Sequence, residues 1–347
     1  MFLNNTTLNT SSGELEDMVL ANSDGNQAFV TSLVALSIIV FMGIIGNSLV
    51  MAVVGRIPSM RTTTNYLLVN VAVADLVTLL LTALHVGLAK LAMAQRGLAQ
   101  SVMFCKFIQA NTISNVPILA TGWTLTVIAI ERYNALIQPM KNARRLTKHN
   151  VWYAIAVMWV VSIVMCLPLL IYLDVDDVTR QCTPGANMHK LNISLTVMVI
   201  LMTLVPFIVI AICYFQIISG LYFKGTICTN TTNPELYHEE LVAKRRLVKL
   251  LLMVTAFFFF TFVPYGVAMI LRFSLDAKKN ATELLALQEL VSVLSFLIPL
   301  HSALNPVLYA FQSRNYREGF WIVTKKIFRR DSLERNNNCQ RPVGTMV

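Results

Sequence analysis

The sequence predicts an all-α membrane protein: a bundle of seven transmembrane helices followed by a short amphipathic eighth helix. Of its 347 residues, 56% are hydrophobic and only 13% are charged, a composition too apolar for a soluble protein of this size. Seven apolar segments of 20 or more residues recur along the chain, and a helix of that length crosses about 30 Å of hydrocarbon. We place the spans at 28–55, 63–90, 105–134, 151–172, 191–222, 243–273 and 286–311.

Charge is distributed unevenly across these spans. If the amino terminus is outside, the inner segments and inner span ends hold 20 of the 28 basic residues and 7 of the 18 acidic residues. The outer segments hold 8 basic and 10 acidic residues, and Asp75 lies alone in mid-membrane. Because membrane proteins concentrate basic residues on the inner side, we expect a multi-pass plasma-membrane protein with its amino terminus outside. The same distribution argues against nucleic-acid binding despite the net charge of +10.

The segments outside the bundle have distinct compositions. Residues 1–27 are polar and acidic, so we expect an extracellular flexible tail that is glycosylated, with no signal peptide. The bundle follows at 28–311. Residues 312–330 alternate aromatic and basic side chains, which predicts an interfacial helix attracted to anionic membrane lipid. Residues 331–347 are polar, so we expect a disordered cytoplasmic tail. Glycosylation sequons on the outer side begin at Asn4, Asn5, Asn9, Asn192 and Asn280.

The first three spans carry polar residues that are costly in hydrocarbon. Asn47 lies in the first span, and Asp75 in the second is a functional-site candidate by default, since its charge needs water, a cation or a partner. In the third span Asn111 and Ser114 lie on one helical face, although such residues also simply hydrogen-bond between helices. That span contains Pro117, which predicts a kink, and ends in Glu131-Arg132-Tyr133.

The later spans add prolines and aromatic residues. Trp159 lies in the fourth span, and Pro206 and Tyr214 lie in the fifth. The sixth span presents Phe258, Phe262, Tyr265, Met269 and Arg272 on one face, with Pro264 among them. The seventh contains His301 and the run Asn305-Pro306-Val307-Leu308-Tyr309.

Together these residues resemble the rhodopsin-like (class A) G-protein-coupled receptors over about residues 30–330, and most of all the neuropeptide receptor group. The matching residues, one set in each span and in the right order, are Gly46-Asn47, Asp75, Glu131-Arg132-Tyr133, Trp159, Pro206 with Tyr214, Pro264 with Tyr265, and Asn305-Pro306 with Tyr309.

The resemblance implies a receptor, not an enzyme, which activates a heterotrimeric G protein when helix six moves outward. Its coupling residues would be Arg132, Glu131, Tyr133 and Met140. Its activation switch would comprise Phe262, Pro264, Tyr214, Asn305, Pro306 and Tyr309. A sodium ion, the one cofactor implied, would act as an allosteric modulator in a pocket of Asp75, Asn47, Thr121 and Asn305. Arrestin is the second expected protein partner.

Three residues depart from the family pattern. Phe262 stands where a Trp is usual, and Gly122 stands where an Ile is common, which weakens packing with Pro206 and Phe258. Lys244 replaces the acid that often restrains the arginine from helix six. We therefore expect measurable basal activity.

The resemblance also implies a disulfide between Cys105 and Cys182, in keeping with an oxidising exterior. The segment from Cys105 to Arg132 is two residues longer than is usual in the family. We therefore expect a bulge or a looser helix start near Pro117.

Residues that the sequence lacks exclude several classes of ligand. Residues 109–118 lack the acid of amine receptors, 280–313 lack the lysine of opsins, and the cysteines do not allow the second outer disulfide of chemokine receptors. A neuropeptide remains favoured, and acidic residues near the opening favour a cationic one. The predicted pocket comprises His85, Asn111, Ser114, Tyr265, Arg272, Gln288, Asp174, Asp176 and Asp177.

Three other classes of protein compete with this interpretation. A receptor for a lipid or small metabolite differs only in the pocket. A channel or transporter would need further charged or broken helices, which the sequence does not show. A membrane enzyme would need clustered catalytic groups, yet the five histidines are scattered and neither H-E-x-x-H nor G-x-S-x-G occurs.

Overall fold

The chain forms a bundle of long helices. The computed structural model describes residues 12–95, 101–109, 112–138, 146–177, 182–183, 185–224, 234–275 and 281–339. Its α-helices are α1 (Ser12–Arg56), α2 (Thr63–Ala94), α4 (Thr112–Leu136), α5 (Val151–Tyr172), α6 (Met188–Val199), α7 (Val205–Ser219), α8 (Pro234–Ser274), α9 (Ala281–Gln312) and α10 (Arg314–Cys339). Within the described residues, seven helical stretches are long and apolar enough to cross a membrane. The predicted fold class is confirmed.

The spans match the expected ones with two differences. Helix α1 begins at Ser12, inside the segment that we expected to be a tail, although its apolar span begins only at Val30. The fifth span is composite: α6 and α7 are joined by a π-helical turn, η5 (Ile200–Leu204), and a second π-helical turn, η6 (Gly220–Lys224), follows α7.

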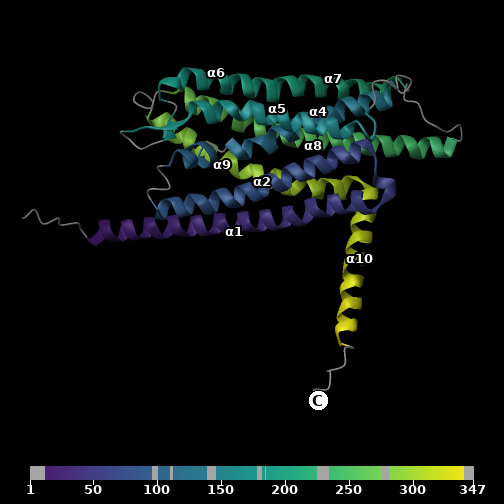
Figure 1. Cartoon of the computed structure of the whole chain (residues 1–347), viewed down its shortest axis with the longest axis horizontal. Coiled ribbons are helices and arrows are strands. Elements are labelled where there is room, and N and C mark those ends of the chain that lie inside the picture. Colours follow the sequence, from purple (N-terminus) through teal and green to yellow (C-terminus); the bar gives the residue numbers. More distant parts are fainter. Residues whose placement is uncertain are drawn as a thin grey trace, which may run out of the picture.

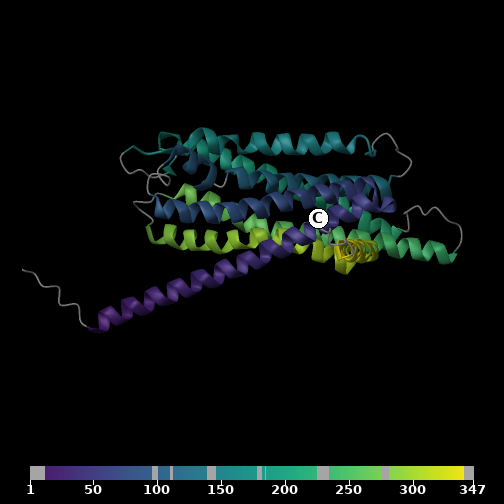
Figure 2. The same cartoon turned by 60° about the horizontal axis from the view of Figure 1, so that its bottom comes forward.

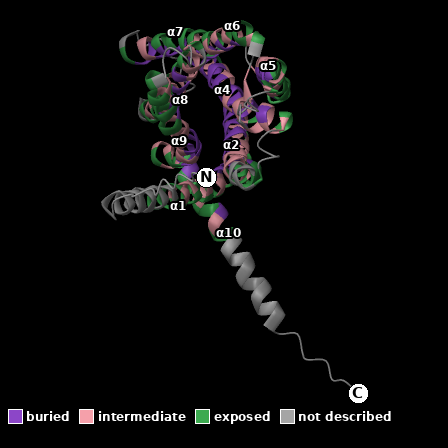
Figure 3. Ribbon diagram, turned by 90° about the vertical axis from the view of Figure 1, so that its left-hand side faces the viewer, coloured by how far each residue is buried: buried purple, intermediate pink, exposed green. Residues whose placement is uncertain are grey.

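The helices lie side by side with α4 in the interior of the bundle (Figures 1 and 3). Helix α4 contacts α2, α5 and α7, whereas α8 and α9 pack on each other and α9 returns to α1. The amino-terminal part of α1 diverges from the other helices (Figure 2). Helix α10 runs across the direction of the bundle (Figure 1). Its start packs tightly on α1, since a Cβ added to Gly319 would lie 2.6 Å from Val53 Cγ1.

A buried asparagine joins three of the helices. Trp159 Nε1 on α5 donates to Asn70 Oδ1 on α2 at 2.9 Å, and Asn70 Nδ2 donates to Thr124 Oγ1 on α4 at 2.8 Å. Asn70 is 5% exposed and Thr124 is fully buried. These bonds set the position of α4, which carries the Glu131-Arg132-Tyr133 run.

One end of the bundle is held by the predicted disulfide, which joins Cys105 to Cys182. Strands β1 (Asp174–Val175) and β2 (Cys182–Thr183) pair antiparallel there, with Val175 opposite Cys182. Cys105 lies in a π-helical turn, η2 (Phe104–Gln109), and α4 continues through Pro117 as a helix. The irregular turn that we expected near Pro117 therefore lies earlier, at the disulfide. This end is called the disulfide end below, and the opposite end the Arg132 end.

Candidate functional site

At the Arg132 end, Glu131 fixes the segment that follows α4. Glu131 is only 4% exposed, and its Oε2 accepts a hydrogen bond from the Leu146 backbone N–H at 3.1 Å. The Leu146 carbonyl accepts from Thr63 Oγ1, at the start of α2, at 3.3 Å. Arg132 is half-buried beside Glu131, and the Tyr133 hydroxyl accepts from Gln138 Nε2 at 2.7 Å. Met140 lies outside the described residues.

At the same end, α8 is hydrogen-bonded to η6, which follows α7. Lys244 forms a 2.8 Å salt bridge with Glu240, one turn earlier on α8. The adjacent Arg245 donates to the Leu221 carbonyl of η6 at 3.1 Å, and its guanidinium lies 4.6 Å from the centre of the Tyr222 ring. The sequence analysis missed Arg245, although it follows the residue that replaces the usual acid.

A cavity of about 630 Å³ opens at this end between α8 and the junction of α9 with α10. Its lining includes both members of the Lys244–Glu240 pair and Arg314. Beside it, Tyr316 is 2% exposed, its ring centre lies 5.4 Å from that of Tyr309, and its hydroxyl donates to Asn65 Oδ1 at 3.4 Å. Burial raises the pKa of Tyr316, so its hydroxyl stays protonated as a donor.

At the centre of the bundle, buried polar residues surround Asp75. Asn305 Nδ2 donates to Asp75 Oδ2 at 2.8 Å, and Asn47 Nδ2 donates to the Gly43 and Ser302 carbonyls, each at 2.9 Å. Asp75 is 2% exposed, and both asparagines are fully buried. Asn47 Oδ1 and Asn305 Oδ1 accept no hydrogen bond from the described part of the chain. Thr121 is buried on α4, and its predicted place in this pocket stays a prediction.

An aromatic cluster lies between this polar centre and the disulfide end. The Phe262 ring lies 4.6 Å from Phe258 and 5.3 Å from His301, and His301 stacks on Phe257 at 4.9 Å. Phe258 occupies the space beside Gly122, where an added Cβ would lie 3.1 Å from Phe258 Cζ. His301 was missed as a site residue, although it precedes Asn305 by four residues and so shares its helical face.

The other predicted switch residues take positions within the helices. Pro264 lies inside α8 and Pro306 inside α9. Tyr214 and Tyr309 are buried in the same central core cluster. Their rearrangement around Arg132 stays a prediction.

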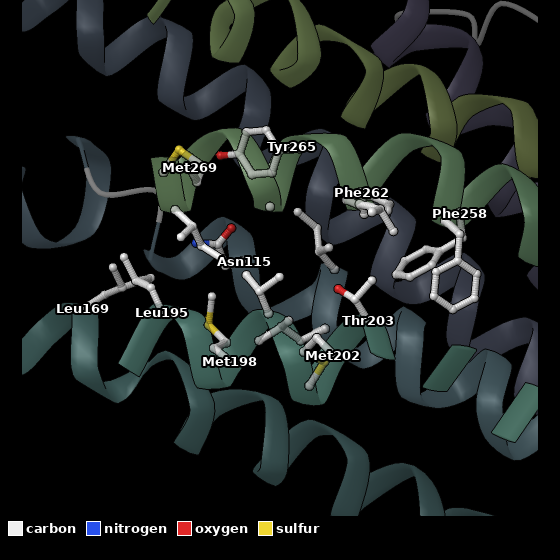
Figure 4. A pocket seen from close by; sticks show the side chains of 17 residues that line it. Asn115, Leu169, Leu195, Met198, Met202, Thr203, Phe258, Phe262, Tyr265 and Met269 are labelled. Atoms are coloured by element: carbon white, nitrogen blue, oxygen red, sulfur yellow. The ribbon is translucent and has the colours of Figure 1, made fainter. Parts of the chain in front are cut away.

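Two cavities lie toward the disulfide end. The first, of about 90 Å³, lies among α4, α5, the fifth span and α8, with Phe258 and Phe262 at one end and Leu169 and Leu195 at the other (Figure 4). It is lined by Asn115, Ile118, Leu119, Leu169, Leu195, Met198, Val199, Met202, Thr203, Phe258, Phe259, Phe262, Val263, Tyr265, Gly266, Met269 and Ile270. We call it the apolar chamber.

The second cavity, of about 250 Å³, lies among α1, α2, α4, α8 and α9. It is lined by Leu36, Thr78, Thr82, His85, Val86, Ser114, Asn115, Ile118, Tyr265, Ser292, Ser295, Phe296, Ile298 and Pro299. We call it the polar chamber. Asn115, Ile118 and Tyr265 line both chambers and form the wall between them.

Comparison with known proteins decides the family. A family model described as "7 transmembrane receptor (rhodopsin family)" matches residues 46–309. The chain belongs to this family.

Its relatives include receptors named for peptides. The galanin receptor 2b of Danio rerio is 28% identical over 87% of this chain and 76% of its own length. The somatostatin receptor type 4 of Rattus norvegicus is 25% identical over 89% of this chain and 77% of its own length. The substance-P receptor of Aquarana catesbeiana is 28% identical over 85% of this chain and 70% of its own length. The chain is thus a rhodopsin-family receptor with neuropeptide receptors among its relatives.

The structure of this receptor assembles part of the predicted ligand pocket. His85, Ser114 and Tyr265 line the chambers. Arg272 is half-buried on α8 and Gln288 is exposed on α9, and neither lines these two chambers, so their role in the pocket stays a prediction. Asn111 lies outside the described residues.

Asn115 is the pocket residue that the sequence analysis missed. It completes the spacing of 111, 114, 115 and 118, which is one face of a helix. Asn115 lines both chambers, whereas the predicted Ser114 lines only the polar chamber.

Four other predicted residues, Asp174, Asp176, Asp177 and Asn192, belong to the described segments near the disulfide end. Asp174 and Asp177 are exposed, and Asp176 is half-buried. Asn192 is half-buried inside α6, a poorer position for a glycan than the loop that a sequon favours. Its glycosylation stays a prediction, and Asn4, Asn5, Asn9 and Asn280 lie outside the described residues.

Proposed function

We propose that this rhodopsin-family receptor lies in the plasma membrane, binds an extracellular peptide at the disulfide end and activates a heterotrimeric G protein at the Arg132 end. One observation carries the proposal: a chain of contacts leads from the cavity lining to the centre of the bundle. Phe262 touches His301 at 5.3 Å between ring centres, His301 Nε2 lies 3.5 Å from Asn305 Nδ2, and Asn305 donates to Asp75 at 2.8 Å. The printed names of the relatives support a peptide as ligand.

Helix α8 is the element suited to respond. It supplies Phe262 and Tyr265 to the ligand cavities and Lys244 and Arg245 to the Arg132 end. A ligand that gains more contacts with one position of α8 shifts the population toward that position, and only this difference in affinity drives activation. Outward movement of α8 would then open the Arg132 end to the G protein, with arrestin as a later partner at the same end.

We also propose that Asp75 holds a sodium ion together with Asn47 and Asn305. A hard cation prefers oxygen ligands, and the site offers the Asp75 carboxylate beside the buried oxygens Asn47 Oδ1 and Asn305 Oδ1, which accept no hydrogen bond from the described residues. A bound sodium ion would supply charge compensation for Asp75 and favour the resting arrangement.

A lipid or small metabolite is the second candidate ligand, since the apolar chamber is lined almost entirely by hydrocarbon side chains. Exposing cells that express the receptor to peptide pools and to lipid pools separates the two. We expect G-protein activation by peptides that disappears in Arg132→Ala. A response to lipids alone would contradict the peptide proposal.

A further inference from the structure

We infer that the two chambers together receive the uncharged end of a peptide, with a C-terminal carboxamide in the polar chamber and the side chain of the last residue, a branched aliphatic one, in the apolar chamber. This inference rests on the proposed function and specifies its ligand. The common wall of Asn115, Ile118 and Tyr265 suits such a residue, because its side chain and its carboxamide branch from one Cα atom.

The first step concerns charge. The described residues that line the two chambers include no Lys, Arg, Asp or Glu. A free carboxylate or ammonium group placed there would lose its hydration without gaining an opposite charge, and an unpaired buried charge is strongly unfavourable. The ligand group that enters is therefore neutral.

The second step concerns the hydroxyl groups of the polar chamber. Thr78 Oγ1 donates to the Ala74 carbonyl at 2.9 Å and Thr82 Oγ1 donates to the Thr78 carbonyl at 2.8 Å. On the facing helix, Ser292 and Ser295 donate to the Gln288 and Ser292 carbonyls, each at 2.8 Å.

All four hydroxyl hydrogens are thus used within their own helices, and the oxygens offer only lone pairs to the chamber. The face formed by these four oxygens disfavours a carboxylate, which also only accepts. It suits a carboxamide NH₂, which brings two donors without charge. The carboxamide oxygen then needs a donor, and the Asn115 side-chain amide in the common wall has one to offer.

The third step concerns size. The apolar chamber has a volume of about 90 Å³, which is smaller than the cavity of about 150 Å³ that accommodates benzene. A branched aliphatic side chain fits this volume better than an aromatic ring. Met198, Met202 and Phe262 supply a matching apolar lining.

The test compares two synthetic tetrapeptide pools, random at the first three positions and ending in Leu, one pool amidated and the other with a free C-terminal acid. G-protein activation is measured in cells expressing the wild-type receptor. We expect the amidated pool to be at least about tenfold more potent than the acid pool, because the described lining offers a carboxylate no opposite charge. A third pool that ends in amidated Lys should be inactive.

A charge placed in the chamber sharpens the test. Ser295→Lys puts a cation in the polar chamber and should shift the preference by about tenfold toward the free acid. If the Ser295→Lys variant does not reach the cell surface, Ser292→Lys places a cation in the same chamber and serves as the second test. The matched control is Ser274→Lys, since Ser274 makes the same 2.8 Å bond to its own helix but lies outside both chambers and is exposed. It should keep the preference for the amide.

The outcomes separate this inference from the function on which it rests. Equal potency of acid and amide pools, or an active Lys-ended pool, would overturn the inference and leave the peptide receptor standing. No response to either Leu-ended pool, together with activation by lipids, would overturn both.

Discussion

The side-chain amide of Asn305 donates a 2.8 Å hydrogen bond to Asp75, which joins the last span to the second at the centre of the bundle. One turn away on the same helix, His301 packs against Phe257, Phe258 and Phe262. The aromatic lining of the ligand cavity and the buried acid are therefore connected through a single turn of α9. We expect a ligand that displaces Phe262 to shift His301 and, through it, Asn305, which donates to Asp75.

Replacing the buried acid tests the sodium site. Wild-type receptor should unfold at a higher temperature in sodium chloride than in choline chloride of equal ionic strength, because an ion that binds only the folded state stabilises it. Asp75→Asn keeps the shape but removes the charge, so the sodium-dependent rise should vanish. Thermal unfolding of purified receptor in both salts gives the answer.

Glu318→Gln is the control for this experiment, since Glu318 is an exposed acid paired with Arg314 on α10. This variant should keep the wild-type response to sodium. A sodium-dependent rise that persists in Asp75→Asn would place the ion elsewhere.

The contact between Gly122 and Phe258 predicts a cost of overpacking. An Ile at position 122 would meet a ring whose Cζ atom lies 3.1 Å from the first added carbon. Gly122→Ile should therefore destabilise the receptor by about 1–3 kcal/mol. Thermal unfolding of the purified variant measures the loss.

A double-mutant cycle isolates this contact. Phe258→Leu shortens the side chain and should recover part of the stability lost in Gly122→Ile, so the two changes are not additive. Strict additivity would mean that Phe258 is not the group that Gly122 accommodates.

The hydrogen bonds of Asn70 predict a stability role. Asn70→Ala removes the acceptor of Trp159 Nε1 and the donor to Thr124, and it should cost about 1–3 kcal/mol because both partners stay buried. Trp152→Phe is the matched control, because Trp152 lies on the same helix α5 and is 53% exposed. Equal unfolding temperatures for the two variants would contradict the role of Asn70.

Much of the fold follows from the sequence because the hydrocarbon core dictates it. Spans of 20 or more apolar residues are forced into helices with internal hydrogen bonds, so the seven spans were predicted. The π-helical turn at Phe104–Gln109 was misplaced, since length shows that extra residues exist but not which turn of the helix absorbs them. The division of the fifth span by η5, and its ending in η6, were not predicted, because no residue pattern in this span distinguishes a π-helical turn from an α-helical one.

The candidate site, like the fold, was predicted only in part. Asp75, Asn47 and Asn305 were predicted because polar groups in hydrocarbon need partners. The structure bonds Asn305 to Asp75, and Asn47 to the Ser302 carbonyl on the helix of Asn305. The chamber wall at Asn115 and the packing of His301 were missed. Which of several polar residues faces a cavity depends on how helices rotate and cross, and side-chain packing between helices decides that. Arg272 illustrates the converse, since it shares the face of Tyr265 but lines neither chamber.

The missing acid on α8 predicts basal activity. Lys244 stands where members of the family often place an acid facing the arginine, and here it pairs with Glu240 instead. Wild-type receptor should activate its G protein measurably without ligand. Lys244→Glu should lower this activity, because an opposite charge near Arg132 favours the resting arrangement.

Lys249→Glu, an exposed position on the same helix, is the control and should leave basal activity unchanged. A silent wild-type receptor would contradict this prediction. So would an equal decrease in both variants, since that would reflect net charge and not the position of Lys244.

The most direct test of the central claim uses purified receptor in lipid bilayers with a heterotrimeric G protein and an amidated peptide from the screen. Nucleotide exchange on the G protein is measured with and without peptide, for wild type and for Arg132→Ala at matched receptor amounts. We predict that peptide accelerates exchange on wild type and not on Arg132→Ala, while peptide binding is retained in both. Peptide-stimulated exchange that is undiminished in Arg132→Ala would contradict the account.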